Sequence, residues 1–599
     1  MRRILSAVAL LLVTIAQACQ RDDATAPHVA ADAAAPPGRA AARLTFTTQP
    51  PAGVPANAVV SPAIQVRVTD DAGNAVPGGQ VKISLGPTTG QGATLSGTTK
   101  GKIIDGVATF SDLRIDQPGR GYTFEATAGP ASGASSEFAV VGPAARLAFV
   151  TEPPASVEGT AAMAPAVRVA IQDALGSMVP GATQAVTLTL GTTPSGGALA
   201  GTPTVPAVDG IATFGDLSIA QPGSGYTLAA AAPSLAGATS SPFAVHLTFT
   251  AVSAGWSHTC GVTMSGAAYC WGSNSSGELG DGSTTAHASP APVAGGLRFA
   301  EVVTGAGNEN YTCGVTTGGT AYCWGSNRYG GLGDGTTVGH TSPAPVVGGL
   351  SFASLSAGTT TCGVTTGGSA YCWGFNAFGQ RGDGTNSSVT APQAVAGGLS
   401  FAVVSQYGFA TCGVTTGSAA YCWGRGDDGQ LGDGTSTVLM SLPAPVTGGI
   451  AFAAVRRGWF HTCGVATDGA AYCWGWDYWG QLGDGTPRSR HNSPVPVSGG
   501  LTFVNVSGGE QHTCGVAAGG VGYCWGDNEG GQLGDGTLSE RSVPTAIAGG
   551  LSFTAVSAGL RYSCGVSTSG KAYCWGANGN GQLGNGTTTS SLTPVQVVQ

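Results

Sequence analysis

The chain has 599 residues, more than one ordinary domain holds, so several domains are expected. Charged residues make up only 9% of the chain, against roughly 25% in typical soluble proteins. The net charge of -8 includes no basic stripe, which argues against a nucleic-acid partner. Glycine accounts for 100 residues, and short apolar runs alternate with turn residues, so the composition predicts an all-β, extracellular protein.

The N-terminus predicts an export signal over residues 1–18. Two arginines precede an apolar stretch that is too short to remain as a membrane-spanning helix. Cys19 follows Ala16-Gln17-Ala18, so the segment resembles a bacterial lipobox with Ala16 in place of the usual leucine. Residues 19–42 are rich in alanine and proline, which predicts a flexible tether from a lipidated Cys19. We therefore expect an outer-membrane or cell-surface lipoprotein, with plain secretion as the alternative.

Two similar modules of about 100 residues follow. The segment "AARLTFTTQPP" returns as "AARLAFVTEPP" 103 residues later, and "DGVATFSDLRIDQPGRGYTF" returns as "DGIATFGDLSIAQPGSGYTL". Ile64, Val66 and Val68 alternate with polar residues, as expected of a half-buried strand. About seven such strands in each module predict two cysteine-free β-sandwiches that resemble bacterial immunoglobulin-like domains, over residues 43–141 and 146–245. We expect Tyr122 and Tyr226 to be structural, each bonded to a nearby carbonyl.

Residues 246–599 contain seven copies of a unit of about fifty residues. The repeated tryptophan of "CWG" stands at Trp271, Trp324, Trp373, Trp423, Trp474, Trp525 and Trp575. Each unit contains about four short strands, and one small sheet cannot bury both of its faces alone. Seven sheets stacked in a ring predict a seven-bladed β-propeller, with the repeated Trp and Phe between the blades.

The signature of the unit carries a family resemblance. "HTCGVTMSGAAYCWGSNSSGELGDG" resembles the repeat of the regulator of chromosome condensation family, and all seven units share the pattern. The same superfamily includes propellers like β-lactamase-inhibitor protein II, so the resemblance also implies a seven-bladed propeller. Kelch repeats have a similar period but a different arrangement of Gly, Tyr and Trp. We further expect the strands "HLTFTAV" and "TPVQVVQ", at the two ends of this region, to share one blade and latch the ring.

Fourteen of the fifteen cysteines form pairs ten residues apart, and Cys19 is the one left over. A hairpin turn centred on Ser265 places Cys260 opposite Cys270, within the reach of a disulfide. Free buried thiols, zinc and redox chemistry are the alternatives; zinc sites commonly use closer Cys pairs, and no Cys-x-x-Cys motif occurs. The expected disulfides join Cys260 and Cys270, Cys313 and Cys323, Cys362 and Cys372, Cys412 and Cys422, Cys463 and Cys473, Cys514 and Cys524, and Cys564 and Cys574.

Other polar repeats are interpreted as scaffold. His258, His461 and His512 occupy the same position before "TC", in units too far apart for a shared metal. The aspartates of "GDGT", such as Asp281, are expected to brace turns, with calcium at the rim as the alternative. No catalytic motif stands out, so we expect neither an enzyme nor any metal or cofactor.

Two loops differ from unit to unit, whereas the scaffold positions repeat. One loop precedes "TCG" and the other follows "CWG", and several aromatic residues occur in them. Aromatic side chains on a rigid rim are typical of binding hot spots, with packing against the loops as the alternative. The candidate binding residues are Trp256, Tyr329, Phe375, Phe378, Phe409, Trp459, Phe460, Trp476, Tyr478 and Trp479.

These features predict a non-catalytic surface protein that binds an extracellular protein or a glycan through one propeller face, with the lipid bilayer contacted only by the anchor. The first alternative is a secreted inhibitor of an extracellular enzyme, by resemblance to the β-lactamase inhibitor. The second is guanine-nucleotide exchange on a small GTPase, which the family resemblance implies and the export signal disfavours.

Overall fold

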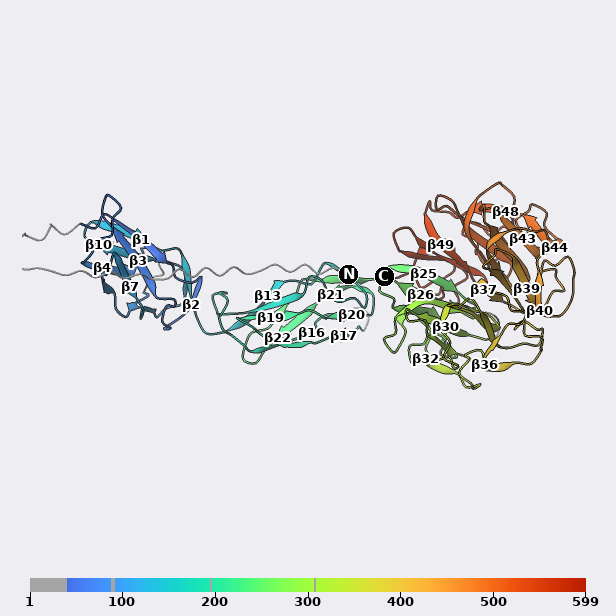
Figure 1. The fold of residues 1–599 in the computed structure, drawn as a ribbon, viewed down its shortest axis with the longest axis horizontal. Helices are drawn as coiled ribbons and strands as arrows, with labels where there is room; N and C mark the ends of the chain where they lie inside the picture. Colours follow the sequence, from blue (N-terminus) through green and yellow to red (C-terminus); the bar gives the residue numbers. More distant parts are fainter. Residues whose placement is uncertain (1–39, 88–91, 194–196, 306, 308, 599) are drawn as a thin grey trace, which may run out of the picture. The chain divides into compact units, whose positions relative to one another are not determined.

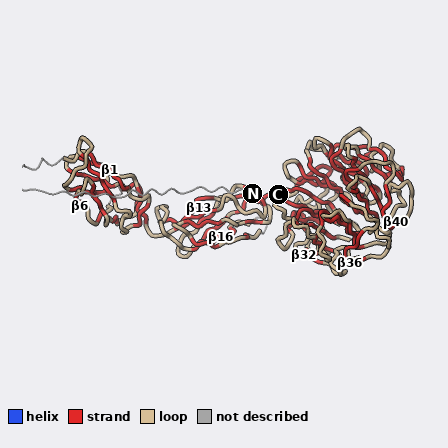
Figure 2. Tube along the Cα trace, in the orientation of Figure 1, coloured by secondary structure: helices blue, strands red, loops and turns tan. Residues whose placement is uncertain are grey.

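The computed structural model describes residues 40–87, 92–193, 197–305, 307 and 309–598. The expected signal segment, Cys19 and the tether up to residue 39 lie outside these ranges. Regular structure within the described residues consists of strands (Figure 2), which confirms the all-β prediction. No helix in these ranges is long and apolar enough to cross a membrane. The chain divides into two compact units, Met1–Gly142 and Pro143–Gln599.

The first unit is a sandwich of short sheets around one core. Its sheets have the strand orders β1-β3-β7, β11-β10-β4-β6, β2-β12-β9 and β5-β8. The strands are β1 (Arg43–Thr48), β2 (Gly53–Pro55), β3 (Ile64–Thr69), β4 (Gln80–Leu85), β5 (Leu95–Ser96), β6 (Lys100–Lys102), β7 (Val107–Phe110), β8 (Arg114–Ile115), β9 (Gly119–Tyr122), β10 (Phe124–Ala128), β11 (Ala131–Ala134) and β12 (Phe138–Val141).

Side-chain alternation in this unit follows the sequence pattern. Ile64, Val66 and Val68 of β3 are buried, while Gln65 and Arg67 between them are exposed. This confirms the predicted half-buried strand, because successive side chains of a strand point to opposite faces.

The predicted structural tyrosine of the first unit is confirmed. The Tyr122 hydroxyl donates a hydrogen bond to the carbonyl oxygen of Gln117 at 2.9 Å. Asp70 braces its turn, with its carboxylate accepting the backbone N–H of Asn74 at 2.8 Å.

The second unit begins with a module of the same strand pattern. Its sheets have the orders β13-β15-β19, β14-β24-β21, β18-β16-β22-β23 and β17-β20. The Tyr226 hydroxyl donates to the carbonyl of Gln221 at 3.0 Å, so the structural role is repeated here. The strands are β13 (Arg146–Thr151), β14 (Ser156–Glu158), β15 (Val167–Gln172), β16 (Ala185–Leu190), β17 (Leu199–Ala200), β18 (Thr204–Pro206), β19 (Ile211–Phe214), β20 (Ser218–Ile219), β21 (Gly223–Tyr226), β22 (Leu228–Ala231), β23 (Ala238–Thr239) and β24 (Phe243–His246).

Seven four-stranded antiparallel sheets follow, each made of consecutive strands and arranged around a common centre (Figure 1). The first three are β25 (Phe249–Ala254), β26 (His258–Thr263), β27 (Ala268–Gly272) and β28 (His287–Pro292); β29 (Phe299–Thr304), β30 (Tyr311–Thr316), β31 (Ala321–Gly325) and β32 (His340–Pro345); and β33 (Phe352–Ala357), β34 (Thr360–Thr365), β35 (Ala370–Gly374) and β36 (Val389–Ala394).

The remaining four sheets repeat this order. They are β37 (Phe401–Tyr407), β38 (Ala410–Thr415), β39 (Ala420–Gly424) and β40 (Met440–Pro445); β41 (Phe452–Arg457), β42 (His461–Ala466), β43 (Ala471–Asp477) and β44 (Ser489–Pro496); β45 (Phe503–Gly508), β46 (His512–Ala517), β47 (Gly522–Gly526) and β48 (Arg541–Ala546); and β49 (Phe553–Ala558), β50 (Tyr562–Ser567), β51 (Ala572–Gly576) and β52 (Ser591–Gln596).

The repeated tryptophan joins each sheet to the one before it. Trp324 is fully buried, packs on Phe299 of its own sheet, and donates its indole N–H to the carbonyl of Glu278 in the preceding unit at 3.0 Å. Gly280 permits this approach, because a Cβ there would lie 2.5 Å from the Trp324 indole nitrogen, and its φ of +71° favours glycine. The glycine-rich turn and the tryptophan therefore form one inter-sheet joint.

The predicted strand latch is wrong. The first strand, β25, pairs within the first sheet, and the last strand, β52, pairs within the last sheet. The repeat boundary falls at the Gly-Gly turn, so each unit already contains a whole sheet. The first and last sheets are joined instead by hydrogen bonds outside the strand ladders. The Trp271 indole donates to the Gln582 carbonyl at 2.9 Å, the Tyr562 hydroxyl donates to the His258 carbonyl at 2.7 Å, and the backbone N–H of Phe249 donates to the Gly570 carbonyl at 2.8 Å.

The two ends of these sheets have different surroundings. We call the end with the β25–β26 and β27–β28 connections, and their equivalents, the loop face, and the opposite end the turn face. The module before the propeller contacts the turn face: the Tyr269 hydroxyl donates to the Ala220 carbonyl at 2.7 Å, and Thr160 bonds Ser265 at 3.1 Å. Tyr269 is fully buried, whereas its equivalents, such as Tyr322 and Tyr573, are partly exposed.

Candidate functional site

The paired cysteines form the frame of the sheets. All seven predicted pairs are disulfides, with Cα atoms 4.0–4.1 Å apart, and every bonded cysteine is fully buried. Cys260 pairs directly with Cys270, and Val262 with Ala268, in the predicted register. Each bridge joins the two central strands of a sheet, so none of these fourteen cysteines carries a free thiol that could bind a ligand.

The three histidines of the "HTC" segments join neighbouring sheets. The imidazole Nε2 atoms of His258 and His461 lie 2.8 Å from the hydroxyls of Thr312 and Thr513 in the next sheet, and that of His512 lies 2.9 Å from Ser563. Burial lowers the pKa of His258 to about 4, and lowers those of His461 and His512 to about 3. The three imidazoles are therefore neutral, and each forms a hydrogen bond with a hydroxyl group of the next sheet.

The aspartates of "GDGT" brace the rim turns, as predicted. The Asp281 carboxylate accepts the backbone N–H of Ser283 at 2.9 Å, and that of Asp334 accepts the N–H of Thr336 at 2.9 Å. Asp334 also lies 2.8 Å from His340. The carboxylate oxygens are thus engaged with protein groups in both turns.

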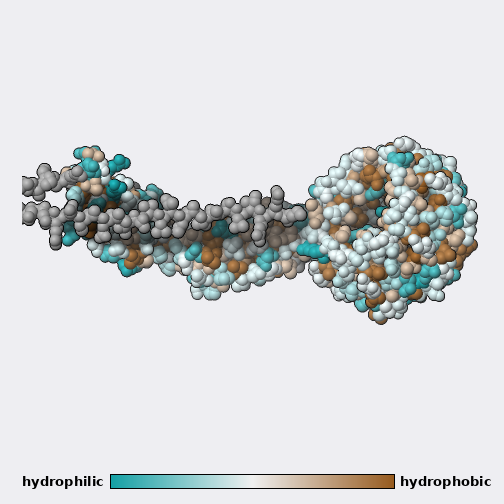
Figure 3. All heavy atoms as spheres, in the orientation of Figure 1, coloured by the Kyte–Doolittle hydropathy of each residue, from teal (hydrophilic) through white to brown (hydrophobic). Residues whose placement is uncertain are grey.

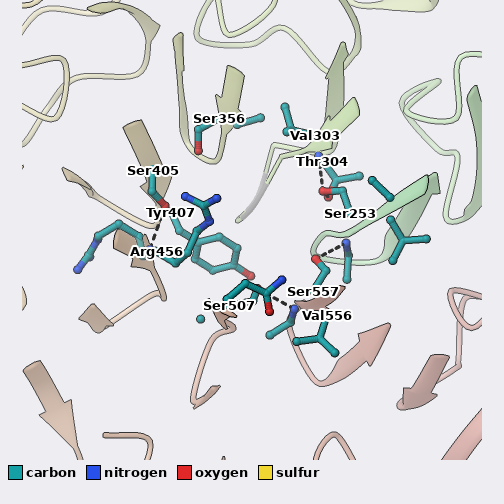
Figure 4. Close-up of a pocket in the computed structure, with 18 of the residues that line it drawn as sticks. Ser253, Val303, Thr304, Ser356, Ser405, Tyr407, Arg456, Ser507, Val556 and Ser557 are labelled. Carbon is teal, nitrogen blue, oxygen red and sulfur yellow. Dashed lines mark hydrogen bonds between the residues drawn. The ribbon is translucent and has the colours of Figure 1, made fainter. Parts of the chain in front are cut away.

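A central channel runs between the inner strands (Figure 4). Serines at one register position bond the next sheet: Ser557 accepts the N–H of Ala254 at 3.0 Å, and Ser253 accepts that of Thr304 at 3.1 Å. Ser356, Ser405 and Ser507 make the same bond to their neighbours. These hydroxyls hold the sheets together, so the serine belt is part of the scaffold.

Val303 and Arg456 interrupt this belt, since they occupy the serine position in the second and fifth sheets. The channel also contains Glu301, whose carboxylate accepts the N–H of Leu355 at 3.2 Å. Burial in the channel raises the pKa of Glu301, and its neighbour Arg456 opposes that rise. Glu301 and Arg456 place two charged groups on the channel wall, at positions where the other repeats do not carry the same residues.

All ten predicted aromatic residues lie on the loop face and form one continuous array. Ring centroids are 5.0 Å apart for Tyr329 and Phe375, 6.0 Å for Phe375 and Phe409, and 5.4 Å for Phe409 and Trp459. The other links join Phe378 to Phe375 and Phe409, Trp256 to Trp459, Trp459 to Phe460, Phe460 to Trp476, Trp476 to Tyr478, and Tyr478 to Trp479.

The array is packed and accessible at once. None of the ten side chains is fully buried, and Tyr478 is 39% exposed. The rings belong to five of the seven sheets, yet they meet because the loops lean toward the axis: Trp256 of the first sheet contacts Trp459 of the fifth, at a centroid distance of 5.4 Å. Both interpretations from the sequence, mutual packing and an exposed aromatic rim, therefore describe the same surface.

A cavity of about 240 Å³ opens within this array. Its walls include Trp256, Tyr329, Phe375, Phe409 and Trp459. Trp459 also packs edge-on against Tyr407, which lines the central channel, so the cavity lies beside the loop-face mouth of that channel. Figure 3 shows a hollow in the propeller bordered by brown, apolar residues.

The two charged residues of this cavity were not predicted from the sequence. Glu309 is 7% exposed and accepts a hydrogen bond from the Ser326 hydroxyl at 2.8 Å, and Arg328 lies over the Tyr329 ring at 5.3 Å. Both stand in the variable loops, next to predicted aromatics. The sequence signal was the extra length of "AGNENY", but nothing in a single sequence indicates that its glutamate is buried.

Comparison with known proteins shows that parts of the repeat region resemble a known repeat family. The family described as "Regulator of chromosome condensation (RCC1) repeat" matches residues 419–465, 468–516, 520–566 and 569–599, and a second model of the same repeat matches 249–278, 452–481 and 553–582. The ultraviolet-B receptor UVR8 of Arabidopsis thaliana is 32% identical over 297 residues, which are 49% of this chain and 56% of the receptor. The human probable E3 ubiquitin-protein ligase HERC4 is 32% identical over 91 residues, 15% of this chain and 9% of the ligase.

Two solved structures are also similar. Human WBSCR16 covers 55% of this chain and 90% of its own, at 19% identity and a TM-score of 0.49. Prp20p from Saccharomyces cerevisiae covers 59% of this chain and 88% of its own, also at 19% identity and a TM-score of 0.49. The chain spans about half of UVR8 and a small part of HERC4. Parts of the C-terminal region therefore match the RCC1 repeat, and the seven stacked four-stranded sheets of this region have the arrangement of a β-propeller.

Proposed function

We propose that this protein is a non-catalytic, surface-anchored binding protein. In this proposal two immunoglobulin-like modules form a stalk, and the seven sheets are the blades of a seven-bladed propeller whose loop face binds an extracellular protein or a glycan. The observation that carries the proposal is the aromatic array, because ten partly exposed rings from different repeats converge on one face. Large aromatic side chains supply much of the binding energy in protein interfaces.

The position of the neighbouring module supports the choice of face. It covers part of the turn face through Tyr269 and Ser265, and the array lies at the opposite end of the sheets. The repeats support recognition as the kind of function, because the loops that carry the array differ from repeat to repeat while the scaffold positions recur. An inhibitor of an extracellular enzyme would use the same face, with the enzyme as the partner.

The test of binding compares two faces of one protein. The double variant Trp476→Ala, Trp479→Ala removes two rings of the array, and Tyr573→Ala removes a partly exposed ring from the turn face as the matched control. Glycan arrays and capture of purified extracellular proteins then measure binding. We expect binding to fall at least ~10-fold in the double variant and to remain in the control. If the double variant retained all binding, the aromatic array would not be the binding surface.

The anchor is tested separately. We propose that Cys19 is lipidated after removal of residues 1–18. Cells that express the chain and are given radiolabelled palmitate should label the protein, and Cys19→Ser should abolish the label. A labelled Cys19→Ser variant, or an unlabelled wild type, would contradict lipidation and leave secretion as the route.

A further inference from the structure

The cavity of the aromatic array contains a buried negative charge. Glu309 is only 7% exposed, and its carboxylate accepts a hydrogen bond from the neutral hydroxyl of Ser326 at 2.8 Å. Among the described residues, no Lys, Arg or His nitrogen lies within 4.0 Å of this carboxylate. A buried carboxylate without a positive partner is costly, so the site favours a cation supplied from outside.

The aromatic walls of the cavity also favour a positively charged ligand. The rings of Tyr329, Phe375, Phe409, Trp459 and Trp256 follow one another at centroid distances of 5.0, 6.0, 5.4 and 5.4 Å. Aromatic faces carry negative electrostatic potential, and they hold ammonium groups that lie within about 6 Å of the ring centre. The cavity of about 240 Å³ is too small for an extended chain of sugars and suits one compact group.

We propose that this cavity binds an organic cation, an alkylammonium group enclosed by the five rings, with Glu309 as its counter-charge. The cation site rests on the proposed function, since it names the chemistry that the loop face recognises. The group can belong to a small molecule or to a lysine side chain of a partner. Arg328, which is exposed at the edge of the cavity over Tyr329, opposes the cation and so lowers its affinity.

The experiment measures calorimetric binding of choline and of its neutral isostere 3,3-dimethyl-1-butanol to the full chain. The two probes have nearly the same shape and differ in charge, so choline should bind at least ~10-fold more tightly if the charge is recognised. Nα-acetyl-lysine methylamide, tested beside choline, distinguishes a partner side chain from a free quaternary ammonium. Equal binding of choline and the isostere, or no binding of any ammonium probe, would overturn the proposal.

Three variants locate the charge. Glu309→Gln should weaken choline binding about tenfold, because it removes the counter-charge and keeps the shape. Arg328→Gln should strengthen binding a few-fold, roughly the reverse of a modest like-charge repulsion. Glu529→Gln is the control: this glutamate is exposed on the same face but pairs with Arg561 at 3.6 Å, outside the cavity. Unchanged affinity in Glu309→Gln, with an unchanged melting temperature, would contradict the assignment.

A failed cation site can be told apart from a failed binding face. If the Trp476 and Trp479 variants lose a partner while choline fails to bind, the face stands and the cation site falls. If choline binding depends on Glu309 while partner capture ignores the whole array, the cavity is a cation site but the proposed recognition function is wrong.

Discussion

The loop face and the turn face of the propeller are built from the same seven repeats, yet they carry different information. On the turn face the "TTGG"-like turns and the Gly-Gly connections recur with little change. On the loop face the segments before "TCG" and after "CWG" differ in length and in residue type. The residues that join the sheets, such as Trp324, therefore recur from repeat to repeat, whereas the residues of the accessible aromatic array differ between repeats. The following experiments test that difference.

A tryptophan that joins two sheets should matter most. Trp324→Ala removes a fully buried indole and its bond to the Glu278 carbonyl, and should lower the free energy of unfolding by about 3–5 kcal/mol. Trp476→Ala, on the loop face, removes a partly exposed ring and should cost less than about 1 kcal/mol. Urea unfolding followed by near-ultraviolet circular dichroism measures both. Similar losses of unfolding free energy in the two variants would contradict the proposed difference between scaffold and surface residues.

A disulfide should have the next largest effect. The double variant Cys313→Ala, Cys323→Ala removes the disulfide between the two central strands of one sheet, whose cysteines are ten residues apart in the chain. It should lower the free energy of unfolding by about 2–3 kcal/mol. Binding at the loop face should be retained, because the bridge lies inside the sheet. A full loss of binding with unchanged stability would be inconsistent with a structural role.

The buried histidines predict a loss of stability in acid. The pKa of His461 is lowered to about 3 by burial and by the nearby Arg457 and His512, below the ordinary value of 6.5. The unfolded chain therefore binds the proton first, so stability falls as the pH drops from about 6.5 toward 3.

His461→Tyr tests this, because Tyr311 and Tyr562 occupy the same repeat position. Between pH 7 and pH 5, this one histidine should lower the free energy of unfolding of the wild type by about 2 kcal/mol. The variant should lack that part of the pH dependence. Melting temperatures across this range provide the measurement. An unchanged slope in the variant would mean that His461 is not a source of the acid sensitivity.

The contact between the turn face and the neighbouring module should contribute least. Tyr269→Phe removes one buried hydrogen bond to the Ala220 carbonyl and should cost about 1 kcal/mol. Tyr573→Phe changes the equivalent, partly exposed residue of the last sheet and should be close to neutral. Differential scanning calorimetry of the two variants makes the comparison. Equal melting temperatures would show that the Tyr269 bond contributes little to stability.

Much of the fold followed from local pattern. The alternation of Ile64, Val66 and Val68, the pairing of Cys260 with Cys270 and the structural role of Tyr122 depend on neighbours in one hairpin or one strand, so the residues alone predicted them. The strand latch failed because a repeat unit does not reveal where its sheet begins. In the structure the boundary lies at the Gly-Gly turn, and Trp271 and Tyr562 join the first sheet to the last.

The repeats, the disulfide partners, the all-β class and the variable aromatic residues could all be derived from the order of residues in the chain. That these aromatics meet could be learned only from the packing of the sheets. Trp256 and Trp459 are about two hundred residues apart in the chain, and they come into contact because the first and fifth sheets face each other around one axis. The burial of Glu309 between such rings is likewise a property of the assembled sheets, since each repeat contributes only one part of the cavity wall.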